Sequence, residues 1–277
     1  MFNIKLQNYI ENPFRTDFLK ELEADYKLCR NYPERYRKKV GELSGLFNLK
    51  GRAKLMGNLY PIGFTGEYDK TTHIIIFGIN PGYGKHNAEE EKEKAKSWRN
   101  YVRFRKSAYK SFFKRVDHGS RYYRAFSLLF SGLLDGYNNE KGTQWDIFQQ
   151  HITNLNLLPY HSRAINLPSK FSIRQWYYLT HNLWSMINFV LNYKPKLFVF
   201  DGKPWYGLLI KHRLIHRYKK RRIKGMNIYF FTIEGIPCVL FDKFFSLHYY
   251  GLKDKDRRIK IPKIIAKNYP TLFSSVK

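Results

Sequence analysis

One short segment constrains the fold more than any other: an apolar run that passes directly into a glycine-rich turn. Residues 74–77 read Ile-Ile-Ile-Phe, and residues 78–82 read Gly-Ile-Asn-Pro-Gly. The run is too short for a helix and is bounded by glycine and proline, so it predicts a buried strand of the parallel type. Ligands of open α/β sheets bind just beyond the carboxyl ends of such strands, where glycine lets them approach the backbone. The turn is therefore a candidate binding site, although Asn-Pro-Gly is also ordinary turn sequence whose asparagine bonds only its own loop.

The chain carries a large excess of positive charge. Its 277 residues include 50 lysines and arginines against 22 aspartates and glutamates, which gives a formal net charge of +28. Repulsion on this scale disfavours a compact fold unless the working partner is a polyanion. The charge is spread along the sequence, whereas a membrane anchor gathers it in one amphipathic helix or cluster. We therefore expect a nucleic acid, double- or single-stranded, as the partner, and no membrane.

Apolar periodicity predicts an α/β fold of helices and strands in alternation. We expect helices near residues 17–26, 87–96, 97–114, 121–134, 176–191 and 205–213, and further strands near 152–158, 196–200, 227–232 and 237–241. This pattern predicts a three-layer sandwich with a central, mainly parallel sheet of four to five strands, flanked by helices. The sheet domain is expected at residues 71–277, with basic insertions. Residues 1–70 are expected to form a helical and loop extension packed on it.

The cysteine count and the N-terminus limit the class of protein further. Cys29 and Cys238 are too few for a four-cysteine zinc site or a cysteine-ligated iron–sulfur cluster, and we expect no metal and no cofactor. The N-terminus lacks the apolar core of a signal peptide, and no apolar run of about 20 residues occurs. We expect a cytoplasmic, nucleoid-associated monomer.

A second asparagine precedes a proline near the carboxyl end of the next predicted strand. Asn156 begins the sequence Asn-Leu-Leu-Pro at residues 156–159. Its amide offers an acceptor and a donor side by side, which matches one edge of a pyrimidine. One orientation of the amide fits uracil or thymine and the reverse fits cytosine, and the sequence does not fix that choice. The alternative is a buried asparagine that bonds neighbouring backbone.

These two patterns resemble motifs of the uracil-DNA glycosylase superfamily, and most closely those of its mismatch-specific and single-strand-selective branches. There the first motif reads Gly-Ile/Met-Asn-Pro-Gly, which stands intact at residues 78–82, and the base-reading strand carries Asn-x-x-Pro, as at 156–159. The resemblance covers roughly residues 71–251, and only these two motifs are specific. It implies that Asn80 orients the attacking water. It also implies that the base is bound by Gly78, Ile79, Pro81, Gly82, Tyr83 and Asn156.

The second catalytic motif of that superfamily, typically His-Pro-Ser after the final strand, has only a partial counterpart here. Residues 242–251 lack the proline, and His248 with the nearby Ser246 is the nearest equivalent. The resemblance therefore assigns His248 a catalytic role and gives Ser246, Tyr249 and Tyr250 contacts to DNA. The densest basic run, residues 211–224, is expected to contact the DNA backbone, although such a run is often only a solvated surface. Its central cations are Lys219, Lys220, Arg221 and Arg222.

The resemblance and the charge together predict a monofunctional DNA glycosylase, which flips out a damaged or modified pyrimidine and hydrolyses its N-glycosidic bond. The uracil-restricted branch has tyrosine after the motif proline, whereas this chain has Gly82. We expect the wider pocket to accept thymine or a 5-substituted or hypermodified, phage-type cytosine, in DNA repair or phage defence. One alternative is a non-catalytic nucleic-acid-binding protein on the same fold. Another is a phosphate-handling enzyme, although neither Gly-x-x-x-x-Gly-Lys-Ser/Thr nor Gly-x-Gly-x-x-Gly occurs.

Overall fold

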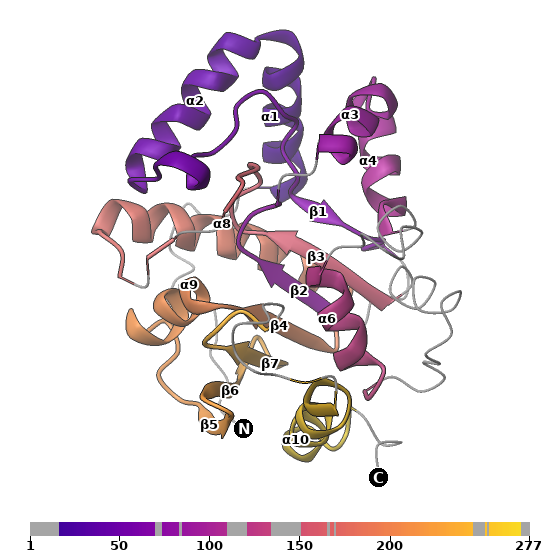
Figure 1. Ribbon diagram of the computed structural model, residues 1–277, viewed down its shortest axis with the longest axis vertical. Coiled ribbons are helices and arrows are strands. Elements are labelled where there is room, and N and C mark those ends of the chain that lie inside the picture. The colour runs from indigo at the N-terminus through magenta and orange to yellow at the C-terminus, as the bar shows by residue number, and fades with distance from the viewer. Residues whose placement is uncertain are drawn as a thin grey trace.

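The computed structural model of the protein describes residues 17–69, 74–82, 85–109, 121–133, 151–164, 167–168, 170–245, 253 and 255–272. Its strands are β1 (Phe64–Thr65), β2 (Ile74–Gly78), β3 (Ile152–Asn156), β4 (Leu197–Asp201), β5 (Lys219–Ile223), β6 (Met226–Ile233) and β7 (Ile236–Phe241). They form one seven-stranded sheet in the order β1-β3-β2-β4-β7-β6-β5 (Figure 1). The protein therefore has the predicted α/β class.

The sheet is mixed, which corrects the expected four to five mainly parallel strands. β3, β2, β4 and β7 are parallel neighbours. β1 pairs antiparallel with β3, and β5, β6 and β7 form an antiparallel ribbon at the other edge. The sequence did not predict β1 because it has only two residues. It did not predict β5 because that strand has four cations in succession, with none of the apolar alternation of a half-buried strand.

Helices occur in all six segments in which the sequence predicted them, with shifted ends, and two more, α2 and α10, lie in segments for which no helix was predicted. They are α1 (Phe18–Asn31), α2 (Pro33–Leu46), α3 (Lys85–Lys94), α4 (Trp98–Ser107), α6 (Arg121–Phe130), α8 (Ile173–Leu191), α9 (Lys203–Tyr206) and α10 (Ile261–Asn268). Short helical turns span Gly51–Ala53, Gly207–Lys211 and Asp256–Lys260. The single helix expected over residues 205–213 is thus a short α-helix followed by a π-helical turn. α4 ends at Ser107, earlier than the expected residue 114, and residues 110–114 lie outside the described part.

Local sequence explains how α1 and α8 begin. Asp17 caps α1 because its carboxylate accepts hydrogen bonds from the N–H groups of Leu19 (3.0 Å) and Lys20 (3.2 Å). α8 begins with a capping box, in which Ser172 and Gln175 each accept a hydrogen bond from the backbone of the other. Both helix starts are therefore fixed by side chains that satisfy N–H groups without an intrahelical partner.

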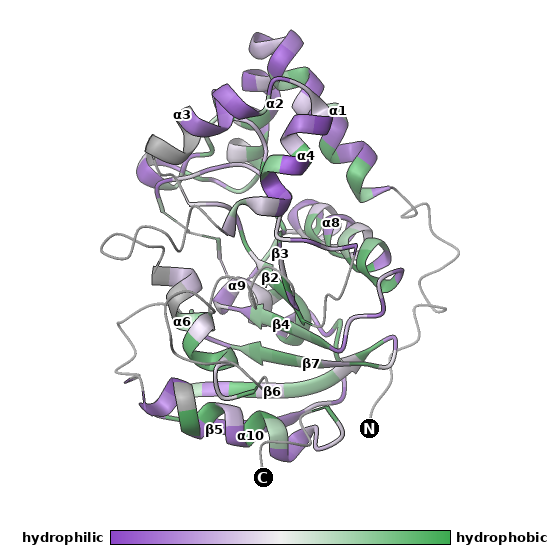
Figure 2. Cartoon of the chain, turned by 90° about the vertical axis from the view of Figure 1, so that its right-hand side faces the viewer, coloured by the Kyte–Doolittle hydropathy of each residue, from purple (hydrophilic) through white to green (hydrophobic). Residues whose placement is uncertain are grey.

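Alternate residues of the central strands face two separate cores. Ile74 and Ile76 pack with α6 and α10, whereas Ile75 and Phe77 pack with α1, α2, α8 and α9. All five residues of β2 are buried because helices cover both faces of the sheet, and this explains the uninterrupted apolar run in the sequence. Figure 2 shows hydrophobic strands at the centre and hydrophilic residues along α3.

The segment before residue 70 contributes to the same core as the sheet. Phe18 and Leu22 of α1 belong to the hydrophobic cluster that contains Phe77, and β1 adds an edge strand beside β3. The domain boundary expected at residue 70 remains a prediction. Within the described ranges, none of the helices combines the length and the apolar character that crossing a membrane would need.

Candidate active site

The carboxyl ends of the central strands meet at the point where the strand order reverses. The chain forms β2, then β3 on one side of it, and then β4 on the other side. In open α/β sheets, ligands bind in the crevice outside the carboxyl ends at such a point. Here those ends are Gly78 on β2, Asn156 on β3 and Asp201 on β4.

The two sequence motifs lie side by side at this edge, although more than seventy residues separate them along the chain. Segment 78–82 continues beyond β2, and segment 157–162 continues beyond β3, so that the two run parallel. A bridge between Gly82 and Ser162 closes the pair. The backbone hydrogen bonds that join them are Leu157 N–H to Gly78 (3.1 Å), Leu158 N–H to Ile79 (2.7 Å) and Ser162 N–H to Pro81 (3.3 Å).

Asn80 is held in one orientation by groups that accept hydrogen bonds. Its Nδ2 donates to the hydroxyl of Ser162 (2.8 Å) and to the carbonyl oxygens of Tyr160 and Pro81 (both 3.3 Å). Because carbonyl oxygens only accept, Nδ2 must face them and Oδ1 must face the other way. Within the described ranges no hydrogen bond reaches Oδ1, which is therefore the group that Asn80 can offer to a water or a ligand. The residue itself is buried, with 9% of its surface exposed.

Asn156 ends a chain of hydrogen bonds whose direction is also fixed. Its Nδ2 donates to the carbonyl of Ile62 (2.9 Å), and its Oδ1 accepts from Nδ2 of Asn154 (3.3 Å). The Oδ1 of Asn154 accepts in turn from the hydroxyl of Tyr122 (3.1 Å). Because the Ile62 carbonyl can only accept, it sets the orientation of both amides. Asn156 thus makes the backbone bond of a structural asparagine and keeps one N–H and one lone pair for a further partner.

Three polar groups converge above Gly78. A side-chain carbon at this position would lie 2.9 Å from Oδ1 of Asn156 and 3.5 Å from both Oδ1 of Asn154 and the hydroxyl of Tyr122. We expected glycine here to admit a ligand; in the structure it admits the Asn156 amide. A side-chain carbon at Gly82 would meet no atom of the described chain within 4 Å, so the open position in the turn is the second glycine.

Asp201 lies on the same face of the sheet, one strand away from Gly78. Phe77 pairs with Phe200, so Asp201 ends β4 at the level at which Gly78 ends β2. Only 1% of its surface is exposed, and its Oδ1 accepts a 2.6 Å hydrogen bond from the N–H of Phe245. Oδ2 has no hydrogen-bond partner in the described part of the chain. Burial raises the pKa of this carboxyl to about 7.

His161 holds the far end of the motif turn. Its Nδ1 lies 3.1 Å from the carbonyl oxygen of Gly82, and since that oxygen only accepts, Nδ1 carries the proton. Burial lowers the pKa of His161 to about 4, so the ring is neutral near pH 7. The turn after β2 is thus tied to the segment after β3 by a side chain as well as by the backbone.

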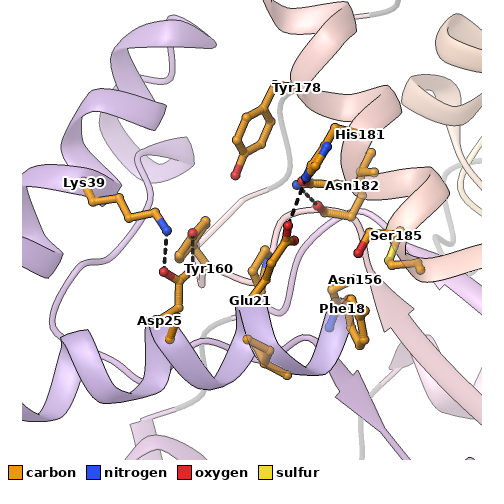
Figure 3. A pocket seen from close by; sticks show the side chains of 15 residues that line it. Phe18, Glu21, Asp25, Lys39, Asn156, Tyr160, Tyr178, His181, Asn182 and Ser185 are labelled. Carbon is orange, nitrogen blue, oxygen red and sulfur yellow. Dashed lines mark hydrogen bonds and ion pairs between the residues drawn. The ribbon is translucent and has the colours of Figure 1, made fainter. Parts of the chain in front are cut away.

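A cavity of about 300 Å³ lies on the opposite face of the sheet, between α1, α2, α8 and the segment after β3 (Figure 3). Two carboxylates of α1 face it. Glu21 lies 3.0 Å from Nε2 of His181, and Asp25 pairs with Lys39 and accepts a 2.5 Å hydrogen bond from the Tyr160 hydroxyl. Asn156 contributes to the cavity wall but Asn80 does not. The two asparagines therefore share the strand-end edge and not this cavity.

Several predicted residues lie outside the described part: Tyr83, Ser246, His248, Tyr249 and Tyr250. Phe245, the last described residue before four of them, is bonded to Asp201 at the strand-end edge. The cations of β5 are solvent-exposed along the outer edge of the sheet. Among the described residues, no group of three or more histidine, cysteine, aspartate or glutamate side chains could hold a metal ion.

Three polar residues of the site were not predicted from the sequence: Tyr122, Asn154 and Asp201. Asn154 precedes Asn156 by two residues, and the two-residue period of a strand could have placed both amides on one face. Asp201 directly follows the apolar run of β4, just as Gly78 closes that of β2. Tyr122 carries no comparable signal because its place depends on how α6 packs on the sheet.

The comparisons with known proteins supply no relative: no protein-family model and no curated sequence matches this chain.

Proposed function

We propose that the protein is a monofunctional DNA glycosylase that removes a damaged or modified pyrimidine and leaves an abasic site. The observation that supports this most is the pairing of segment 78–82 with segment 157–162. It brings the two motifs shared with uracil-DNA glycosylases to one edge of the sheet, at the point where open α/β proteins bind ligands. Within the described residues, Oδ1 of Asn80 receives no hydrogen bond, and Asn156 keeps one N–H and one lone pair for a further partner.

The chemistry needs positioning and charge stabilisation more than a covalent intermediate. The base must first leave the helical stack, at a cost of roughly a few kcal/mol. Cleavage of the glycosidic bond then builds positive charge on the sugar and negative charge on the base. In this proposal Oδ1 of Asn80 orients the attacking water, Asn156 binds the base edge, and His248 stabilises the departing base.

The cations of β5 are proposed to bind the DNA backbone. Arg221 of β5 lies opposite Ile228 of β6, and Ile228 lies opposite Phe241 of β7. Phe241 in turn lies opposite Asp201, the last residue of β4. Arg221 therefore lies at the level of the strand-end edge, four strand spacings from β2, or about 19 Å. DNA carries one negative charge per roughly 1.7 Å of its axis, so a duplex engaged at the edge would carry several phosphates within that span. The net charge of +28 supports the same partner.

The open position at Gly82 suggests the substrate class. No atom of the described residues lies within 4 Å of a side-chain carbon placed there, and the residue is exposed. We propose that this opening admits a substituent at the 5-position, as in thymine or in a hypermodified cytosine. A role in repair or in defence against phage would follow from which base is excised.

Replacement of Asn80 by alanine tests the proposal. Loss of the group that orients water should lower the single-turnover excision rate about 100-fold or more, because positioning of this kind contributes several kcal/mol. Affinity for uncleaved duplex should stay within about threefold. A suitable control is Asn268→Ala, since Asn268 also donates to a backbone carbonyl (Ile264, 2.8 Å) but does so on α10, away from the edge.

Equal activity of the Asn80→Ala variant and the wild type would refute the assigned role of Asn80. Tight binding of every duplex without release of any base would instead favour the second candidate, a nucleic-acid-binding protein without catalysis. The internal hydrogen bonds of both amides are compatible with that candidate.

A further inference from the structure

Neither of the two asparagines of the site can accept a proton. The oxygen of an amide accepts hydrogen bonds, but an amide is not a base near neutral pH. Hydrolysis of an N-glycosidic bond requires the attacking water to lose a proton as its oxygen bonds to the sugar. Asn80 can orient that water but cannot deprotonate it. A hydrolytic site at this edge therefore needs a carboxylate or an imidazole in addition to the asparagines.

We propose that Asp201 is the general base of the reaction, an inference that rests on the proposed glycosylase function. Its oxygen Oδ2 takes a proton from the attacking water as the water oxygen bonds to C1′ of the sugar. The bond between C1′ and the base nitrogen breaks, and its electron pair leaves with the base. The negative charge of the carboxylate also stabilises the positive charge that develops on the sugar ring.

The position of Asp201 supports this role. It ends β4 at the level of Gly78 and faces the same side of the sheet as Val199, which packs in the core beside α6. Tyr122 of α6 lies above Gly78 on that side. Burial is the main cause that raises the pKa of the Tyr122 hydroxyl, and the negative charge of Asp201 is the next largest. The carboxylate therefore faces the region in which Tyr122, Asn154 and Asn156 converge.

The hydrogen bonding of Asp201 goes beyond what a structural role requires. One oxygen accepts from Phe245 N–H, and an asparagine could make that bond equally well. The second oxygen is buried without a partner in the described part of the chain, and leaving a buried charged group unpaired is costly. A general base needs such an oxygen, because the proton of the water must find an unoccupied lone pair. A pKa near 7 also suits a base that works at neutral pH.

The hydrogen bond to Phe245 connects this carboxylate to the second predicted motif. Phe245 immediately precedes residues 246–250, which include His248. Asp201 thus fixes the position of Phe245, the last described residue before that segment. One carboxyl group would serve two purposes, with Oδ1 anchoring the chain before the second motif and Oδ2 acting on the water.

Replacement of Asp201 by asparagine separates the two purposes, since the amide oxygen can still accept from Phe245. Excision of the base that the wild type releases fastest is measured under single-turnover conditions from pH 5.5 to 9. We expect the wild-type rate to rise with an apparent pKa near 7. Asp201→Asn should be at least 100-fold slower at pH 8, without that rise, because a general base contributes about 100- to 10,000-fold. Affinity for uncleaved duplex should change less than threefold.

Asp242→Asn is the matched control. Asp242 directly follows β7, and its carboxylate accepts hydrogen bonds from the backbone and side chain of Asn227 at 2.8 and 2.6 Å. The Asp242→Asn substitution removes one negative charge near the same edge. We expect it to leave the excision rate and its pH profile unchanged. Thermal unfolding of both variants shows whether they are folded.

Two results would overturn the role of Asp201 while leaving the glycosylase proposal intact. One is an Asp201→Asn rate within threefold of the wild type. The other is a wild-type rate that does not change between pH 6 and 8, which needs no variant. Absence of base release from the wild type on every duplex would refute the glycosylase function itself, and the assignment of Asp201 would fail with it.

Discussion

Gly78 shows how a single missing side chain organises the site. The hydrogen atom at this position leaves room for the amide oxygen of Asn156, which would lie 2.9 Å from a side-chain carbon. Real side-chain carbons do not tolerate such an approach. The chain of hydrogen bonds from Tyr122 through Asn154 to Asn156 therefore depends on a glycine in the neighbouring strand.

Gly78→Ala should destabilise the protein by about 1 to 3 kcal/mol, the usual cost of forcing a methyl group into a packed interior. Chemical denaturation measures the change in the free energy of unfolding. Gly82→Ala is the control, because a side-chain carbon there meets no atom within 4 Å and the backbone needs no glycine conformation. Its stability should stay within about 0.5 kcal/mol of the wild type. Equal losses in the two variants would contradict the close approach at Gly78.

The sequence predicts the residues of the site unevenly, for a physical reason. Gly78 and Asn80 could be identified because strand, turn and motif are contiguous. Asn156 could be identified because it precedes a proline at a strand end. Asp201 and Tyr122 could not, because their contribution depends on β4 lying next to β2 and on α6 packing over that pair. Such neighbours are a property of the topology, which local patterns do not encode.

At the scale of elements, β5 differs most from its neighbours in the sheet. In the sheet that the described residues form, it pairs only with β6, and its residues are exposed or half-buried. Charged side chains on an edge strand oppose pairing with another sheet, so the cations protect this edge whether or not they bind DNA. The four central parallel strands were predictable from buried apolar runs. β5 was not, because pairing with β6 gives it a strand conformation that its own sequence does not favour.

Arg221 and Arg222 should contribute directly to DNA binding. The double variant Arg221→Gln, Arg222→Gln should weaken binding and reduce the slope of log K against log salt concentration by about 1 to 2, because each lost phosphate contact removes about 0.9 from the slope. The matched control is Arg35→Gln, Lys38→Gln on α2, whose cations are also exposed. Figure 1 places α2 and β5 at opposite ends of the molecule.

Binding titrations between about 50 and 200 mM salt give both slopes. A reduction of equal size in the two double variants would mean that the net charge, and not the β5 edge, attracts DNA. An unchanged slope in both would contradict DNA contact by either surface.

At the scale of the whole molecule, the sheet separates two faces with different contents. One face carries the cavity beside α1 and α8, and the other carries the polar residues above Gly78 together with the buried Asp201. Burial of a carboxyl group couples the site to global stability. The pKa of Asp201 is raised from 3.8 to about 7 in the folded protein. Between these two pH values the folded protein binds a proton that the unfolded chain does not, so the free energy of unfolding falls as the pH rises through this interval.

The free energy of unfolding should therefore respond to Asp201→Asn in a pH-dependent way. Near pH 4 the carboxyl is neutral and the variant should resemble the wild type. At pH 8 the wild type holds a buried charge, and the variant should be more stable by 1 kcal/mol or more, with about 4 kcal/mol as the limit set by the change in pKa. Denaturation curves across this range provide the difference. A difference that does not vary with pH would contradict a raised pKa at Asp201.

Direct detection of a released pyrimidine tests the central claim. Purified protein is incubated with duplex and single-stranded DNA that carry uracil, mismatched thymine, hydroxymethylcytosine or glucosylated hydroxymethylcytosine, and the free base is identified by mass spectrometry. We expect at least one of these substrates to yield a free base and an abasic site without strand cleavage by the protein. Intact DNA in every reaction, with the protein shown to be folded, would contradict it.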